Sequence, residues 1–104
     1  GLYNNALPIA IQVCDLTRQI YGEYHSEYAI SISILASLYQ AMGNFITAEP
    51  FFQQALQIMR KTYPGEEHSQ LASALNNLGG LYYEEYKYLA AEPLFQKALE
   101  IIGG

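Results

Sequence analysis

The stretch AEPFFQQAL at residues 48–56 returns as AEPLFQKAL at residues 91–99, with seven of nine letters unchanged. The two copies begin 43 residues apart in a chain of 104 residues. The similarity extends outward, because HSEYA from His25 returns as HSQLA from His68 at the same spacing. A third, weaker copy lies in residues 1–22 at an offset of 42. A period in this range predicts a repeat architecture in which each repeat is one small structural unit.

Each repeat unit is predicted to hold two helices. Leu71, Leu75, Leu78 and Tyr82 recur at steps of three and four, which is the spacing of one helix face. The segment AISISIL from Ala29 alternates apolar and polar letters and by itself predicts a β-strand. Its repeat partner ASALNNL does not alternate, so the repeat favours a helix there too. We expect helices over residues 3–21, 27–42, 45–62, 69–85 and 87–102.

The helix ends have recognisable signals. Ser26 and Ser69 are expected to be N-caps, because a hydroxyl can accept a hydrogen bond from a free backbone N–H. Gly43 and Asn44 predict a tight turn with Asn44 as the next cap. In the second unit Tyr86 stands where Gly43 does, so we expect that turn to differ in detail.

The prolines of the repeated phrase have a structural interpretation. Pro50 and Pro93 fall beyond the first turn of their predicted helices. Each removes one backbone hydrogen bond and should bend the helix at the same place in each unit.

Composition limits the classes of function. Hydrophobic residues make up 51% of the chain and charged residues 14%, which is too apolar for a disordered protein. The net charge is −5 and the five basic residues form no stripe, so we expect no nucleic-acid partner. The apolar runs are too short to span a bilayer, and we expect no membrane partner and a cytoplasmic location. Cys14 is the single cysteine, which leaves no disulfide framework or thiolate zinc site within one chain.

No group of residues predicts catalysis, a metal or a cofactor. His25 and His68 should lie one repeat apart, too far to share a metal, and are expected at loop caps. Cys14 aligns with a leucine of later repeats and is expected to be a small buried hydrophobe. Glu66–Glu67 and Glu84–Glu85 are neighbours in sequence, so we interpret them as a solvated acidic surface. We expect no enzyme in this segment.

The letters resemble the tetratricopeptide repeat family, which pairs helices through small residues at their contact. The residues that match the pattern are Leu35, Ala36, Tyr39, Ala48, Phe52, Ala55 and Leu56 in one unit, and Leu78, Gly79, Tyr82, Ala91, Phe95, Ala98 and Leu99 in the next. The ordinary repeat has about 34 residues, and the longer period here resembles the kinesin-light-chain-like subtype found in long bacterial and eukaryotic arrays. The chain departs from it with ISIL in place of LNNL and HS in place of HP. The resemblance implies an all-α, right-handed superhelical solenoid of antiparallel helix pairs.

We expect one domain over residues 1–104 with five helices. Residues 1–22 would be the second helix of a truncated repeat, followed by full repeats at residues 26–65 and 68–104. That first helix should expose Ile9, Val13 and Leu16. The simplest explanation is a fragment of a longer array. The alternative is self-association through the terminal helices, with Leu94, Leu99, Ile101 and Ile102 at the other end.

In the resembling family the inner face of the first helices holds a peptide, which implies a non-catalytic interaction scaffold. The candidate residues lie beside the core stripe and are Ser33, Ser37, Gln40, Asn76, Asn77, Gly80, Tyr83 and Glu84. Asn76 could grip a peptide backbone, Gly80 could leave room for it, and Tyr83 could pack on an apolar side chain. The lysine and asparagine clamp of the family's carboxylate binders is absent. We therefore expect a protein or peptide ligand of basic or neutral character.

Overall fold

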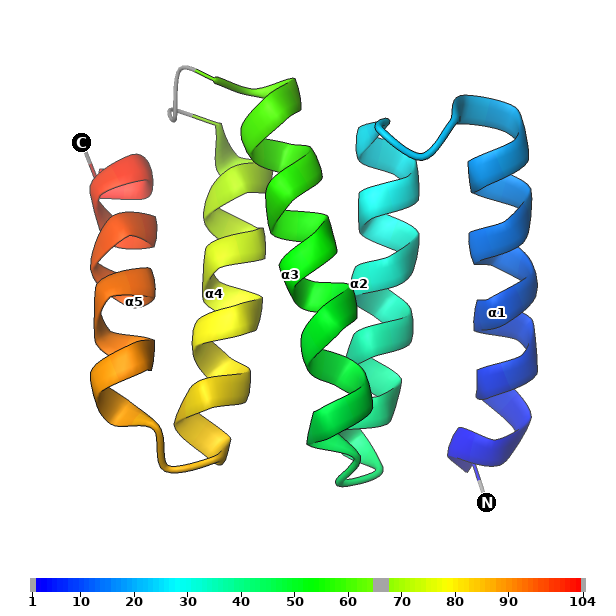
Figure 1. The fold of residues 1–104 in the computed structure, drawn as a ribbon, viewed down its shortest axis with the longest axis horizontal. Coiled ribbons are helices and arrows are strands. Elements are labelled where there is room, and N and C mark those ends of the chain that lie inside the picture. Colours follow the sequence, from blue (N-terminus) through cyan, green and yellow to red (C-terminus); the bar gives the residue numbers. More distant parts are fainter. Residues whose placement is uncertain (1, 65–67, 104) are drawn as a thin grey trace.

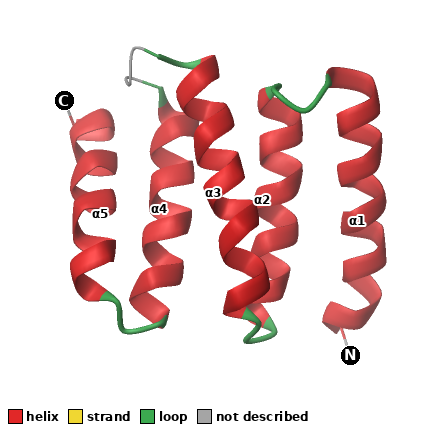
Figure 2. Cartoon of the chain, in the orientation of Figure 1, coloured by secondary structure: helices red, strands yellow, loops and turns green. Residues whose placement is uncertain are grey.

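The structure, a computed structural model, describes residues 2–64 and 68–103 (Figures 1 and 2). Within these residues it holds five α-helices and no strand: α1 Leu2–Tyr21, α2 Ser26–Ala41, α3 Phe45–Thr62, α4 Ser69–Glu84 and α5 Tyr88–Gly103. The predicted all-α fold and five helices are confirmed. The alternating segment that resembles a strand lies inside α2.

Helices that follow one another in the chain pack side by side and antiparallel (Figure 1). Among the described residues, α2 and α4 are the one pair of helices that touch without being consecutive. We call α2 and α4 the first-type helices and α1, α3 and α5 the second-type helices. The molecule is only 18 Å thick along its shortest axis, about the depth of two packed helices. The result is a short solenoid with the first-type helices neighbouring one another on one side.

The core uses small residues where helices cross and large ones between them. Ala36, Ala48 and Ala72 are fully buried, and Phe52 is the largest side chain that is almost completely buried. Full burial of such a side chain stabilises the fold by about 1.5–3 kcal/mol. Cys14 is buried between α1 and α2 as predicted.

Two sequence predictions concern α1 and the prolines. Ile9, Val13 and Leu16 are exposed on α1, as expected for a second-type helix without its first-type partner. The helices continue through Pro50 and Pro93, which lie inside α3 and α5. The bend at each proline stays a prediction.

The predicted N-caps of the first-type helices are wrong by one residue. Ser26 and Ser69 are the first helical residues, and His25 and His68 are the caps. In each case the imidazole Nδ1 accepts a hydrogen bond from the backbone N–H two residues further on, at 3.0 Å for His25 and 3.1 Å for His68. An imidazole nitrogen therefore does the work that sequence preference assigns to a hydroxyl.

Each capping histidine is held by a tyrosine at the end of the preceding helix. The rings of Tyr21 and His25 stack with centroids 4.6 Å apart, and those of Tyr63 and His68 at 3.8 Å. The Tyr63 hydroxyl also donates a hydrogen bond to Gln70 Oε1 at 3.0 Å. The stacked ring orients the imidazole, which explains why histidine serves as the cap.

The turn between α4 and α5 has the same backbone as the turn between α2 and α3, contrary to expectation. Gly43 has φ 81° and Tyr86 has φ 63°, so both lie in the left-handed region. In both turns the N–H of the next residue donates to a carbonyl five residues back at 2.8 Å. This helix-ending pattern usually takes glycine, because a Cβ is strained there. The sequence difference at Tyr86 therefore changes the strain and leaves the geometry.

The acidic surface was predicted incorrectly at one residue. Glu84 is exposed, but Glu85 is largely shielded and its Oε1 makes no hydrogen bond among the described residues. Its Oε2 lies 3.6 Å from Lys87 Nζ. Glu85 is the C-cap of α4, so the chain turns over it and removes it from water. Glu66 and Glu67 lie outside the described residues.

Candidate functional site

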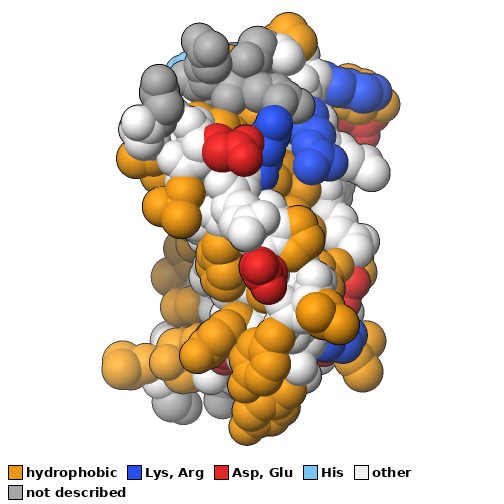
Figure 3. Space-filling model, turned by 90° about the vertical axis from the view of Figure 1, so that its left-hand side faces the viewer, with side chains coloured by type: hydrophobic (Ala, Val, Ile, Leu, Met, Phe, Trp, Pro, Cys, Tyr) orange, Lys and Arg blue, Asp and Glu red, His pale blue; other side chains and the backbone are white. Residues whose placement is uncertain are grey.

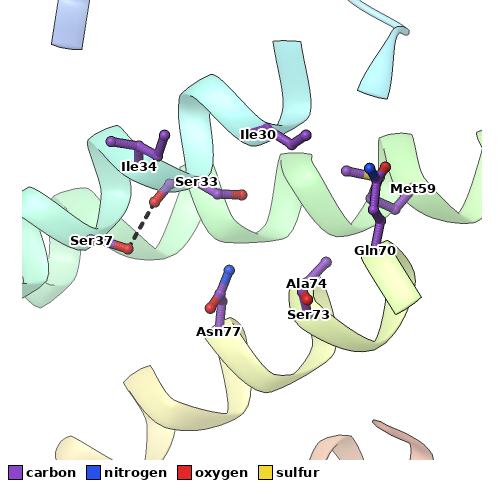
Figure 4. Close-up of a pocket in the computed structure, with 9 residues that line it drawn as sticks. All are labelled: Ile30, Ser33, Ile34, Ser37, Met59, Gln70, Ser73, Ala74 and Asn77. Carbon is purple, nitrogen blue, oxygen red and sulfur yellow. Dashed lines mark hydrogen bonds between the residues drawn. The ribbon is translucent and has the colours of Figure 1, made fainter. Parts of the chain in front are cut away.

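An open hollow of about 330 Å³ lies between α2 and α4 (Figure 4). We call it the α2–α4 groove. Its lining residues are Ile30, Ser33, Ile34, Ser37, Met59, Gln70, Ser73, Ala74 and Asn77. The buried side chains of Met59, from α3, and Ala74, from α4, contribute an apolar part of this lining.

The α2 wall of the groove is apolar. Ile34 is 54% exposed and Ile30 is half-buried. Residues advance by about 100° along a helix, so isoleucines two positions from the buried Ile32 point to the opposite side. The alternation that resembles a strand thus places two isoleucines on the open face of the helix.

The serines of this wall have their hydroxyl protons engaged within α2. Ser33 Oγ donates to the carbonyl of Ala29 at 2.9 Å, and Ser37 Oγ donates to the carbonyl of Ser33 at 3.0 Å. Such bonds to the preceding helical turn are common for serine within helices. Ser33 and Ser37 therefore line the groove as predicted, but they offer a ligand small surfaces and acceptor oxygens in place of free donors.

The α4 wall is polar and one of its amides is available. Gln70, Ser73 and Asn77 face the groove from α4 (Figure 4). Gln70 is engaged by the Tyr63 hydroxyl. Within residues 2–64 and 68–103, the Asn77 side chain makes no hydrogen bond, and its amide extends into the groove (Figure 4). An asparagine amide both donates and accepts, so Asn77 can pair with a peptide backbone.

A hydrogen bond connects the two first-type helices near their C-terminal ends. Gln40 Nε2 donates to Glu84 Oε1 at 2.7 Å. Both residues were predicted site residues from equivalent parts of successive repeats. This contact joins α2 to α4 and leaves the Glu84 carboxylate exposed beside the groove.

The other three predicted residues lie apart from this lining. Asn76 is exposed on α4 but does not line the groove. A Cβ added at Gly80 would meet nothing within 4 Å, so this position is open. Tyr83 lies in a different hollow against α5, where its ring meets Tyr88 edge-on with centroids 5.2 Å apart.

Sequence reasoning missed the apolar part of the groove. The signal for Ile30 and Ile34 was present, because both fall opposite the buried stripe once the segment is drawn as a helix. Nothing local indicates Met59, since it reaches the groove from α3 through tertiary packing.

The charge of the first-type helices is one-sided. The sequences of α2 and α4 contain Glu27 and Glu84 and no lysine or arginine. No group of three or more histidine, cysteine or acidic side chains among the described residues could hold a metal ion. No helix within the described ranges is long and apolar enough to cross a membrane. The groove therefore offers apolar surface, one amide and negative charge.

A hydrogen-bonded cluster on the other side connects α3 to α4. Tyr82 Oη donates to Glu49 Oε2 at 3.1 Å, and Gln53 Nε2 donates to Tyr82 Oη at 3.3 Å. Gln53 also donates to Glu49 at 2.9 Å. Burial raises the pKa of the Tyr82 phenol, the Gln53 hydrogen bond opposes this effect, and Glu49 adds to it. The cluster fixes how a first-type helix sits on the preceding second-type helix.

Helix pairs stacked in this way, with first-type helices adjoining, define a helical repeat protein of the solenoid class. The tetratricopeptide repeat model matches residues 1–61 and 31–102, so the chain belongs to the tetratricopeptide repeat family. Among solved structures it is similar to BtubC (BKLC) from P. vanneervenii, a kinesin-light-chain-like bacterial protein, with a TM-score of 0.85 and 26% identity. The match covers 97% of this chain and 39% of that one. No curated protein matches the chain in sequence.

Proposed function

We propose that this protein is a non-catalytic scaffold that binds a partner polypeptide in the α2–α4 groove. Membership of the tetratricopeptide repeat family suggests a protein–protein interaction role. The observation that carries the choice of surface is the pairing of exposed Ile34 with the unengaged amide of Asn77 across one hollow. An exposed apolar side chain beside a free amide matches a peptide that inserts an apolar side chain and pairs its backbone.

The preferred ligand is an extended segment with one apolar anchor and a basic or neutral flank. The groove volume of about 330 Å³ suits a single large aliphatic or aromatic side chain. The flank should lie toward Glu84, whose carboxylate is exposed and which has no lysine or arginine near it on α2 or α4. An acidic flank would meet like charge there.

The test is binding to a peptide array in which the central residue and the flanking charge vary. Ile34→Ser should weaken binding about five- to tenfold, because a half-exposed isoleucine gains about 1 kcal/mol when a ligand covers it. Asn77→Ala should weaken it by a similar factor through the lost hydrogen bonds. The matched control is Ile46→Ser, which changes an isoleucine that is 86% exposed on α3.

The control should bind like the wild type. Equal binding by the Ile34→Ser and wild-type proteins would contradict the choice of groove. A consistent preference for acidic peptides would contradict the proposed charge of the ligand. If Asn76→Ala with Tyr83→Ala removed binding while Ile34→Ser did not, the partner would lie on the face away from α2.

A further inference from the structure

A second apolar hollow of about 270 Å³ lies at the α5 end of the molecule. Its lining residues, which we call the α5 end face, are Tyr83, Tyr88, Ala91, Glu92, Phe95, Gln96 and Leu99. Figure 3 looks onto this end and shows hydrophobic side chains gathered over the lower half of the visible surface. This face is separate from the α2–α4 groove and shares no residue with it.

The same surface one repeat earlier is covered. A shift of 43 residues carries Ala91, Phe95 and Leu99 onto Ala48, Phe52 and Leu56. Leu56 is 5% exposed because α4 packs over α3, whereas Leu99 is 69% exposed. The two leucines occupy equivalent positions, so the difference is the absence of a covering helix.

The covered copy shows which contacts the missing helix would make. On α3, Glu49 and Gln53 are joined to each other and both bond the hydroxyl of Tyr82 from α4. On α5, Gln96 Nε2 donates to Glu92 Oε1 at 3.4 Å in the equivalent arrangement. The α5 end face thus presents the same acceptor and donor to a hydroxyl.

We propose that the α5 end face binds an amphipathic helix of the α4 type supplied by a partner polypeptide. This helix carries leucines at the spacing of Leu71, Leu75 and Leu78 and a tyrosine at the position of Tyr82. The leucines cover Phe95 and Leu99. The tyrosine hydroxyl donates to Glu92 and accepts from Gln96, which sets the register of the helix along α5.

A second copy of this chain does not supply such a helix by stacking end to end. Its opposite end is α1, a second-type helix whose exposed Ile9 and Leu16 correspond to Phe51 and Ile58 of α3. Ile58 is buried and Phe51 packs against the core, in the helix pair formed by α2 and α3. Stacked copies would place two second-type helices together and would still lack a first-type helix between them.

The probe is a labelled peptide with the sequence of residues 68–86, bridged by a lactam at the positions of Ser73 and Asn77 to hold it helical. Fluorescence anisotropy with the intact protein should show saturable binding. Leu99→Ser should weaken this binding at least tenfold, and Ile102→Ser should not, although Ile102 is similarly exposed at 66% and lies outside the hollow.

A peptide with phenylalanine at the Tyr82 position should bind about fivefold more weakly, which corresponds to one hydrogen bond. This difference should disappear against the Gln96→Ala, Glu92→Ala protein, as a double-mutant cycle requires. Equal affinity of the two peptides for the wild type, or no binding at all, would overturn the proposal. So would light scattering that shows a dimer lost in Leu99→Ser, because the occupant would then be a second copy. Ile34→Ser should leave peptide binding unchanged, which separates this test from that of the groove.

Discussion

Replacing Tyr86 by glycine should show that the turn before α5 stores backbone strain. Tyr86 has φ 63°, where a residue with a Cβ costs about 1–2 kcal/mol. Glycine removes this cost but loses about 0.5–1 kcal/mol through the greater freedom of the unfolded chain. The Tyr86 ring is 80% exposed and meets Tyr88 edge-on at 6.3 Å, so its own contribution is small.

The sharpest comparison is therefore between Tyr86→Gly and Tyr86→Ala. Both variants lose the ring, but alanine keeps the Cβ. We expect the glycine variant to be more stable by about 1 kcal/mol, which corresponds to a rise in Tm of roughly 4–8 °C for a domain of this size. The reciprocal change, Gly43→Ala, should destabilise the protein by about the same amount, because Gly43 has φ 81°.

Urea unfolding followed by circular dichroism at 222 nm measures these free energies. Equal m-values among the variants would show that their denatured states are alike. If Tyr86→Gly and Tyr86→Ala had the same stability while Gly43→Ala was destabilised, the two turns would not share a left-handed residue. The inferred strain at Tyr86 would then be wrong.

Four further changes have expected outcomes. His68→Ala should cost about 1–2 kcal/mol in urea unfolding through the lost cap and ring stack, and His68→Asn should restore part of it. Gly80→Ala should raise Tm, because helix propensity gains about 1 kcal/mol and the new Cβ meets nothing within 4 Å; an unchanged Tm would contradict this. Burial raises the pKa of the Tyr82 phenol, so above about pH 10 the unfolded chain ionises first and stability falls; this fall should be smaller in Tyr82→Phe. Burial, with a smaller effect of Asp15, raises the pKa of the Cys14 thiol, so iodoacetamide should alkylate Cys14 at least tenfold more slowly in the folded protein than in urea.

The helices were predictable because their apolar period is strong and is written twice. The segment from Ala29 to Leu35 is the instructive case, since its local alternation indicates a strand. Only comparison with its repeat partner favoured a helix, and the structure places it in α2. Tertiary packing overrides the local pattern there, as it does for many short apolar segments.

The errors have local causes that sequence preferences do not contain. Histidine replaces serine as the cap because Tyr21 or Tyr63 stacks on it, and that contact depends on where the preceding helix ends. Tyr86 adopts the left-handed backbone because the hydrogen bonds of the turn outweigh its strain. These are cases in which geometry fixed by neighbours decides against single-residue propensity.

The candidate groove was predicted on its polar residues and missed on its apolar ones. Ser33, Ser37 and Asn77 line it, and Gln40 and Glu84 bridge its two helices. Ile30 and Ile34 were treated as part of the alternation and were not assigned to the open face. Asn76 and Tyr83 were assigned to the same stripe because helical spacing alone does not say on which side the neighbouring helix packs.

The tyrosine–histidine stacks have a consequence for how the repeats tolerate change. Three residues separate Tyr21 from His25 and four separate Tyr63 from His68, yet the rings meet in both places. Each junction between repeats is thus closed by an aromatic clasp that does not depend on the length of the connecting segment. Insertions between the two rings should therefore be accepted at these junctions without altering how one repeat meets the next, which makes them suitable points for adding tags or loops.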